Sequence, residues 1–175
     1  VAAGGDPSLI FTQDSYDKET TDAYEIGTKL NMLDGRLRMN AAVFWTDVEN
    51  AQQFEFFPVG SIQAVSKIDE QEITGWEVDA NFIVSDNISL FAGYGYTDAE
   101  VTKLLAQPAF EGNVVPYIEE YNFVGGFQAN YPLTAGLTLT ARGQYMRFGE
   151  VWYDSGNLAG SERSPISLLD ARLGI

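Results

Sequence analysis

Two groups of carboxylates have residue types and spacing that could do chemistry. Asp69 and Glu70 are followed by Glu72, and Glu119 adjoins Glu120. Paired carboxylates can act as a general acid and base, or can bind calcium through their oxygens. The alternative, which we favour, is that these side chains are solvated charges of loops or of a polar strand face. We therefore expect no catalytic residue and no metal site among them.

The rest of the composition also disfavours an enzyme. The chain of 175 residues has no Cys and no His, which removes disulfides, thiolate ligands, Cys nucleophiles and the commonest general base. Lys and Arg total 10 against 25 Asp and Glu, a formal net charge of -15. Such a field repels phosphate backbones. We expect a protein that is not an enzyme, holds no cofactor and binds no nucleic acid.

Aromatic residues in long, Gly- and Pro-containing connections are the best candidates for ligand binding. Aromatic rings supply contact area at a low entropic cost. The alternative is that these rings only pack among the loops. The candidates are Phe54, Phe56, Phe57, Tyr117, Trp152 and Tyr153.

The elements that would position these residues are strands, because apolar and polar residues alternate with period two. Seven strands are predicted, at 22–32, 36–48, 73–84, 88–98, 119–131, 137–148 and 166–175. Short connections at 33–35, 85–87 and 132–136 alternate with long ones at 49–72, 99–118 and 149–165. All tight turns then lie at one end of an antiparallel up-and-down sheet. Long strands with loops sorted in this way are typical of outer-membrane β-barrels.

Aromatic residues in the apolar register test which face of the sheet meets lipid. In a membrane barrel, Trp and Tyr gather in that register near the strand ends, at the lipid headgroups. The opposite register holds Glu25, Lys29 and Arg38, which a dry core could not accept without partners. A half-buried soluble sheet is the alternative. The predicted membrane-interface girdle consists of Tyr24, Trp45, Trp76, Tyr96, Tyr121, Tyr131 and Tyr145.

Two hairpins in this chain resemble the β-barrel of TonB-dependent outer-membrane receptors of the siderophore-receptor type. The first hairpin reads TTDAYEIGTKLNMLDGRLRMNAAVFWTDVENAQ, with Tyr-Glu-x-Gly-x-Lys, Asp-Gly-Arg-Leu and Asn-x-Ala-x-Phe in the family's order. The second reads ITGWEVDANFIVSDNISLFAGYGYTDAE. Later strands match more loosely, so the resemblance covers about residues 19–175.

The resemblance implies a large barrel that encloses a plug domain, binds a scarce nutrient in its extracellular loops and draws energy from the TonB complex. Residues 1–21 would be an extracellular loop or strand end, and residues 22–175 part of the barrel, without plug or closing strands. The expected location is the bacterial outer membrane, and the expected partners are its lipid, the receptor's own plug and a chelated nutrient, most often a ferric siderophore. A passive porin-like barrel and a soluble sugar-binding β-sandwich are the alternatives.

Overall fold

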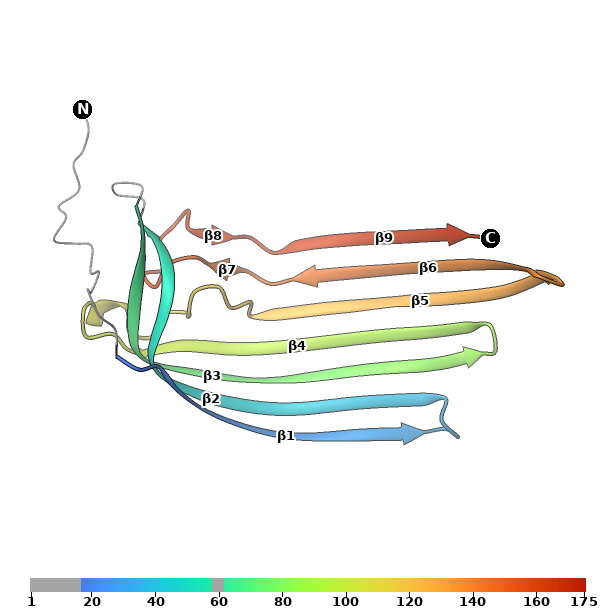
Figure 1. The fold of residues 1–175 in the computed structure, drawn as a ribbon, viewed down its shortest axis with the longest axis horizontal. Helices are drawn as coiled ribbons and strands as arrows, with labels where there is room; N and C mark the ends of the chain where they lie inside the picture. Colours follow the sequence, from blue (N-terminus) through green and yellow to red (C-terminus); the bar gives the residue numbers. More distant parts are fainter. Residues whose placement is uncertain (1–16, 58–61) are drawn as a thin grey trace, which may run out of the picture.

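The fold is one antiparallel sheet of seven strands in the order β1-β2-β3-β4-β5-β6-β9, with a small β7-β8 ribbon at one end (Figure 1). A computed structural model describes residues 17–57 and 62–175. The large-sheet strands are β1 Thr20–Met32, β2 Leu37–Phe57, β3 Ile62–Ser85, β4 Ile88–Lys103, β5 Tyr121–Thr134, β6 Leu137–Phe148 and β9 Ile166–Gly174. The ribbon consists of β7 Val151–Trp152 and β8 Glu162–Arg163, and a 3-10 helix, η2, spans Pro108–Phe110.

All seven predicted strands are confirmed, and so is the sorting of their connections. The tight turns after β1, β3 and β5 lie together at one end of the sheet, and the long connections lie at the other (Figure 1). In the first turn Leu33 and Asp34 both have φ 54°, and Gly35 follows with φ 85°. Asp and Gly adopt these left-handed angles at low cost, so the Leu33-Asp34-Gly35 signal predicted the turn correctly.

The predicted long loop at 49–72 is wrong, because most of it is strand. β2 and β3 stay paired as far as Phe57 and Ile62, and this outer hairpin stands at a steep angle to the other strands (Figure 1). Asn50 has φ 55°, and the β3–β4 register shifts between Glu70 and Gln71. Such irregularities bend a strand and interrupt its side-chain alternation. The sequence pattern therefore ends at the bend although the pairing continues.

Cross-strand pairing places the whole apolar register on one face of the sheet. Tyr24 pairs with Trp45, and Trp76 pairs with Tyr96, which pairs with Tyr121. Large apolar residues on this face are left exposed, Ile26 by 66% and Leu169 by 80%. No apolar core covers this face in the part of the chain that the structure describes, contrary to the soluble β-sandwich alternative.

The opposite face is polar and carries hydrogen bonds between strands. Asn40 Nδ2 donates to both carboxylate oxygens of Asp79, at 3.1 and 3.0 Å. Two aromatic residues on this face lie against glycines. Phe44 pairs with Gly75, where an added Cβ would come within 2.5 Å of the ring. Phe91 lies over Gly126 in the same way, with the Arg142 guanidinium 4.7 Å from its ring centroid.

Buried apolar residues gather at the loop end, where the outer hairpin of β2 and β3 meets β4 and the connection after it. Ile68 and Val101 are fully buried there. Among the described residues no helix is long and apolar enough to cross a membrane. The loop-end core consists of Val48, Ala51, Ile68, Ala99, Val101, Leu104 and Val115.

Candidate functional site

Three connections meet at the loop end: the outer hairpin of β2 and β3, the 104–120 connection with η2, and the 149–165 connection with the β7-β8 ribbon. Tyr117 joins all three. Its hydroxyl donates to the carbonyl oxygen of Phe54 at 2.6 Å, and its backbone N–H donates to the carbonyl oxygen of Trp152 at 2.8 Å. Its ring centroid lies 5.5 Å from that of Tyr153. The positive φ of Tyr117, 65°, is held by these contacts from both sides.

The structure connects four of the six aromatic residues predicted to bind ligand, Tyr117 and Tyr153 through their rings, and Phe54 and Trp152 through their backbone carbonyls. We call Phe54, Tyr117, Trp152 and Tyr153 the aromatic junction. Phe54 is 67% exposed and Tyr117 is 50% exposed, so ring surface stays open to solvent. The side chains of Phe56 and Phe57 lie outside the described residues. Ligand binding by these residues stays a prediction.

The 149–165 connection is held in shape by one carboxylate. Asp154 Oδ1 accepts the N–H of Gly156 at 2.9 Å, and Oδ2 accepts the N–H of Leu158 at 3.3 Å and the hydroxyl of Ser161. Asp154 is only 7% exposed. Buried N–H groups of a loop need such acceptors, because an unpaired one is costly. The carboxylate fixes the segment that carries Tyr153.

Asparagines then tie this connection to the one before β5. Asn157 Oδ1 accepts the N–H of Val114 at 2.8 Å, and its Nδ2 donates to the Val114 carbonyl at 3.0 Å. Asn113 Nδ2 donates to the carbonyl of Ser155 at 2.9 Å. Nothing in the local sequence pattern signals these contacts, because the partners lie more than 40 residues apart.

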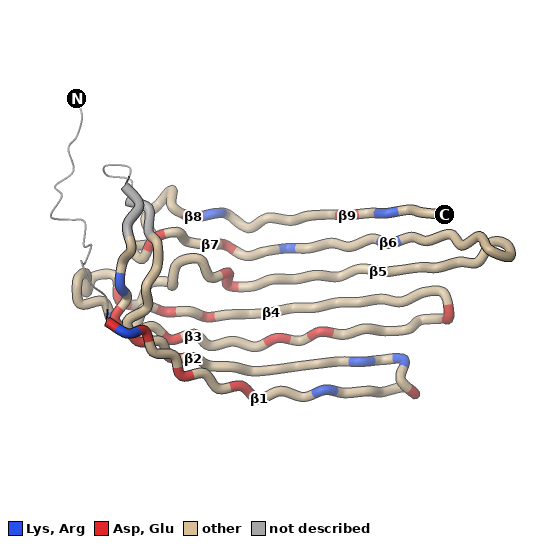
Figure 2. The backbone as a smooth tube through the Cα atoms, in the orientation of Figure 1, with Lys and Arg blue, Asp and Glu red and all other residues tan. Residues whose placement is uncertain are grey.

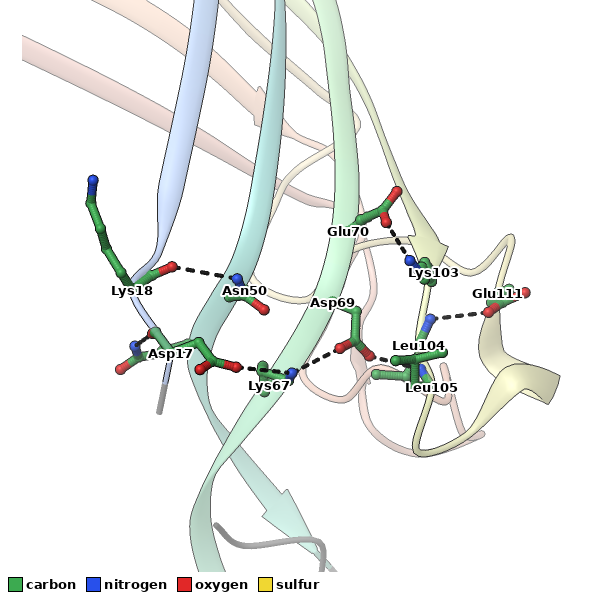
Figure 3. Close-up of polar contacts among 11 residues, drawn as sticks. Asp17, Lys18, Asn50, Lys67, Asp69, Glu70, Lys103, Leu104, Leu105 and Glu111 are labelled. Carbon is green, nitrogen blue, oxygen red and sulfur yellow. Dashed lines mark hydrogen bonds and ion pairs between the residues drawn. The ribbon is translucent and has the colours of Figure 1, made fainter. Parts of the chain in front are cut away.

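A polar cluster at the bend of the sheet anchors the connection after β4 (Figure 3). Asp69 accepts the Lys67 ammonium at 2.8 Å and the N–H of Leu105 at 2.7 Å. Beside it, Lys103 Nζ lies 2.6 Å from Glu70 Oε1. Burial alone would raise the pKa of Asp69, but the bonds from Lys67 and Leu105 and the nearby positive charges outweigh burial and lower this pKa below its ordinary value. The Glu70 carboxylate raises the pKa of Lys103.

Both carboxylate groups singled out in the sequence thus contain structural ion pairs. Asp69 is buried, so its interpretation as a solvated charge is wrong. Glu119 lies 2.6 Å from the Arg163 guanidinium, which connects the start of β5 to β8. In the described ranges no group of three or more acidic side chains has a geometry that could hold a metal ion.

Acidic residues nevertheless crowd the loop end of the sheet (Figure 2). A cavity of ≈ 120 Å³ there is bordered by β4, β7 and the residues before β5. Three carboxylates and one indole border it, and this lining favours a cationic or hydrogen-bond-donating group over an anion. The lining residues are Tyr96, Thr97, Asp98, Ala99, Val114, Ile118, Glu120, Glu150 and Trp152.

The predicted girdle residues follow the apolar face as the sequence indicated. The rings of Tyr24 and Trp45 stack at 5.8 Å, and Tyr145 lies 6.2 Å from Phe123. Tyr94, which the prediction left out, connects Trp76 at 5.2 Å with Tyr121 at 6.4 Å. Tyr131 lies toward the turn end, paired with Leu139. Their place at a membrane interface stays a prediction.

Known proteins resemble this chain in sequence. It is 30% identical over 111 residues to the probable TonB-dependent siderophore receptor PiuA of Acinetobacter baumannii, a match that covers 58% of this chain and 14% of that protein. It is 33% identical over 89 residues to the metal-pseudopaline receptor CntO of Pseudomonas aeruginosa, covering 51% of this chain and 12% of that protein. The matches thus span only a small part of these relatives' length.

Solved structures share its fold. The ferric yersiniabactin uptake receptor FyuA from Yersinia pestis superimposes with a TM-score of 0.70 at 20% identity, covering 89% of this chain and 22% of that one. The siderophore receptor PiuA from Acinetobacter baumannii gives 0.69 at 24% identity, covering 95% of this chain and 24% of that one.

A family model described as TonB dependent receptor-like, beta-barrel, matches residues 2–175. In such a barrel the apolar register faces lipid and the polar register faces the lumen. The chain belongs to the TonB-dependent receptor-like β-barrel family, and its strands form an antiparallel up-and-down segment of a barrel in the bacterial outer membrane.

Proposed function

We propose that the chain is part of a TonB-energised receptor that takes up a chelated metal, and that this metal is iron bound to a siderophore. Residues 22–175 would form part of its barrel, and residues 17–21 a strand end on the extracellular side; residues 1–16 lie outside the described residues. A plug domain and the TonB complex would be its partners. The aromatic junction carries the proposal, because the packed rings of Tyr117 and Tyr153 stay partly exposed and are tied by hydrogen bonds to the neighbouring connections.

The charge of the loop end narrows the ligand class. The cavity beside the junction presents Asp98, Glu120 and Glu150. Carboxylates so close together disfavour a strongly anionic ligand. A neutral or cationic metal chelate that offers flat, ring-bearing surface to Tyr117 and Tyr153 fits this environment best.

The test is uptake of radioactive iron by cells whose only copy of the full-length receptor carries a substitution. Catecholate, hydroxamate and citrate chelates of iron are the probes. We expect Tyr117→Ala and Tyr153→Ala each to lower uptake of one chelate at least about tenfold. The reason is that loss of a central aromatic contact weakens the free energy of binding by about 2 kcal/mol. Tyr117→Phe, which keeps the ring, should lose less.

Tyr131→Ala, at the other end of β5, is the matched control and should leave uptake unchanged. Deleting TonB should abolish uptake by the unaltered receptor. Uptake that persists without TonB would contradict the proposal and favour the passive porin-like barrel. Because the proposed activity is transport and not catalysis, the chelate recovered after uptake should be chemically unchanged.

A further inference from the structure

The outward face of β5, β6 and β9 carries an isolated positive charge. The apolar register of the described strands faces outward, and we call it the outward register. Between the tight turns and the membrane-interface girdle, girdle included, this register contains one basic residue, Arg147. It lies two residues beyond Tyr145, toward the loop end, and it is exposed. Within the described part of the chain it forms no ion pair with a carboxylate.

Hydroxyl groups surround this guanidinium. Arg147 Nε donates to the Tyr121 hydroxyl at 3.2 Å, and Nη1 donates to Ser167 Oγ at 3.3 Å. The Tyr145 hydroxyl lies 2.9 Å from the same Ser167 oxygen. An anion stabilises a guanidinium at the edge of the hydrocarbon layer, and the planar set of donors of the guanidinium matches phosphate. The hydroxyls add further donors around that anion.

An apolar hollow opens directly below this group, on the side of the bilayer centre. Small residues of β5, β6 and β9 lie along it, and the rings of Phe123 and Phe127 lie against Gly125 and Gly143. Its volume is ≈ 620 Å³. The lining residues of the apolar register are Gly125, Phe127, Ala141, Gly143, Tyr145, Leu169, Ala171 and Leu173, and those of the polar register are Gly126, Arg142, Gln144, Asp170 and Arg172. A hollow of this kind fits a hydrocarbon chain.

The other half of the sheet is unsuited to an anion. On the loop side of the membrane-interface girdle, Asp22 pairs with Asp47, Asp47 with Glu72, and Glu72 with Glu100, all in the outward register. This exposed row of four carboxylates repels a phosphate. Charge complementarity therefore confines an anionic lipid to the strands around Arg147.

We propose that this surface is a binding site for one phosphate-bearing lipid of the outer leaflet. Arg147, Tyr121, Tyr145 and Ser167 bind the phosphate, and an acyl chain lies in the hollow between β5, β6 and β9. Arg147 lies toward the loops and the hollow lies toward the bilayer centre. A lipid of the outer leaflet has its phosphate and its acyl chains in the same order. The site is independent of the nutrient and of the aromatic junction.

Native mass spectrometry of the full-length receptor in mild detergent tests this proposal, with diphosphorylated lipid A as the probe. We expect Arg147→Gln to weaken retention of the lipid about tenfold or more, because it removes charge-assisted hydrogen bonds. Arg38→Gln removes the same charge from the polar face of β2, away from the hollow, and is the matched control. Ala171→Trp, which fills the hollow, should also weaken retention while Arg147 stays in place.

The same lipid without its phosphates should bind as weakly to the unaltered receptor as the intact lipid binds to Arg147→Gln. Inorganic phosphate should not displace the lipid at equal concentration, since it cannot fill the hollow. Equal retention by Arg147→Gln and the unaltered receptor, or an equal loss in Arg38→Gln, would overturn the proposal. Circular dichroism and heat-modified gel mobility confirm that each variant is folded.

Discussion

The membrane-spanning sheet and the loop end are stabilised in opposite ways. The sheet leaves its apolar side chains exposed on one face and is held by its backbone ladder, with Ile26 66% exposed. The loop end buries Ile68 completely and uses side-chain bonds such as those of Asp69 and Asp154 to hold its backbone. The first region depends on lipid as its solvent, and the second has an interior like that of a soluble domain.

The largest effect should come from emptying that interior. Ile68→Ala removes a fully buried side chain, and such substitutions cost about 2–5 kcal/mol. We expect faster amide hydrogen exchange at Ala99 and Val101 in the full-length receptor, with the spanning strands unaffected. Ile26→Ala, of the same chemistry on the lipid face, should change exchange little because lipid replaces the lost contact. Equal effects of the two substitutions would remove the distinction between the regions.

A charge placed on the lipid face tests the other half of the comparison. Leu90→Arg puts a guanidinium in the outward register, where the cost is about 2–4 kcal/mol near the bilayer centre. Ser89→Arg, the next residue on β4, points to the lumen side and should cost far less. Folding into lipid vesicles, measured against denaturant, compares the two variants. A greater loss in Ser89→Arg would reverse the assignment of the faces.

Removing the carboxylate of Asp154 should loosen only the 149–165 connection. Asp154→Ala leaves the N–H groups of Gly156 and Leu158 without their charged acceptor, at a cost of about 1–3 kcal/mol. Hydrogen exchange at those two amides should rise. Asp154→Asn retains one acceptor oxygen and should have a smaller effect. Unchanged exchange in Asp154→Ala would show that other contacts hold the connection.

The smallest effect concerns pH. Because the folded pKa of Asp69 is lowered, its carboxylate stabilises the bend fully above the unfolded value of about 3.9, and this contribution is lost as pH falls through the folded pKa. The hydrogen-exchange rate of the Leu105 amide, corrected for its intrinsic rate, should be constant between about pH 7 and 5. It should rise only below about pH 4, where an ordinary aspartate carboxylate becomes protonated. In Asp69→Asn that acid-dependent rise should be absent.

The two regions also differ in how much of them can be predicted from sequence. Period-two alternation indicated all seven strands, because each spanning segment meets lipid on one side and water on the other. The outer hairpin was missed because Asn50 and the shift at Glu70 break the alternation. The junction aromatics could be selected by residue type, but Asp69, Asp154 and Asn157 act on partners that only the fold brings close. Arg147 could have been found by extending the alternation of residues 137–148 one step past Tyr145.

Two phenylalanine rings lie flat over glycines on the lumen-facing side of the sheet, and they affect how much space is left beside the barrel wall. Phe44 over Gly75 and Phe91 over Gly126 keep bulky side chains against the wall on the lumen side. A larger residue at Gly75 would push the Phe44 ring toward the barrel axis. The two glycines thus leave room for these rings to lie against the sheet, so the clearance beside it depends on residues that have no side chain of their own.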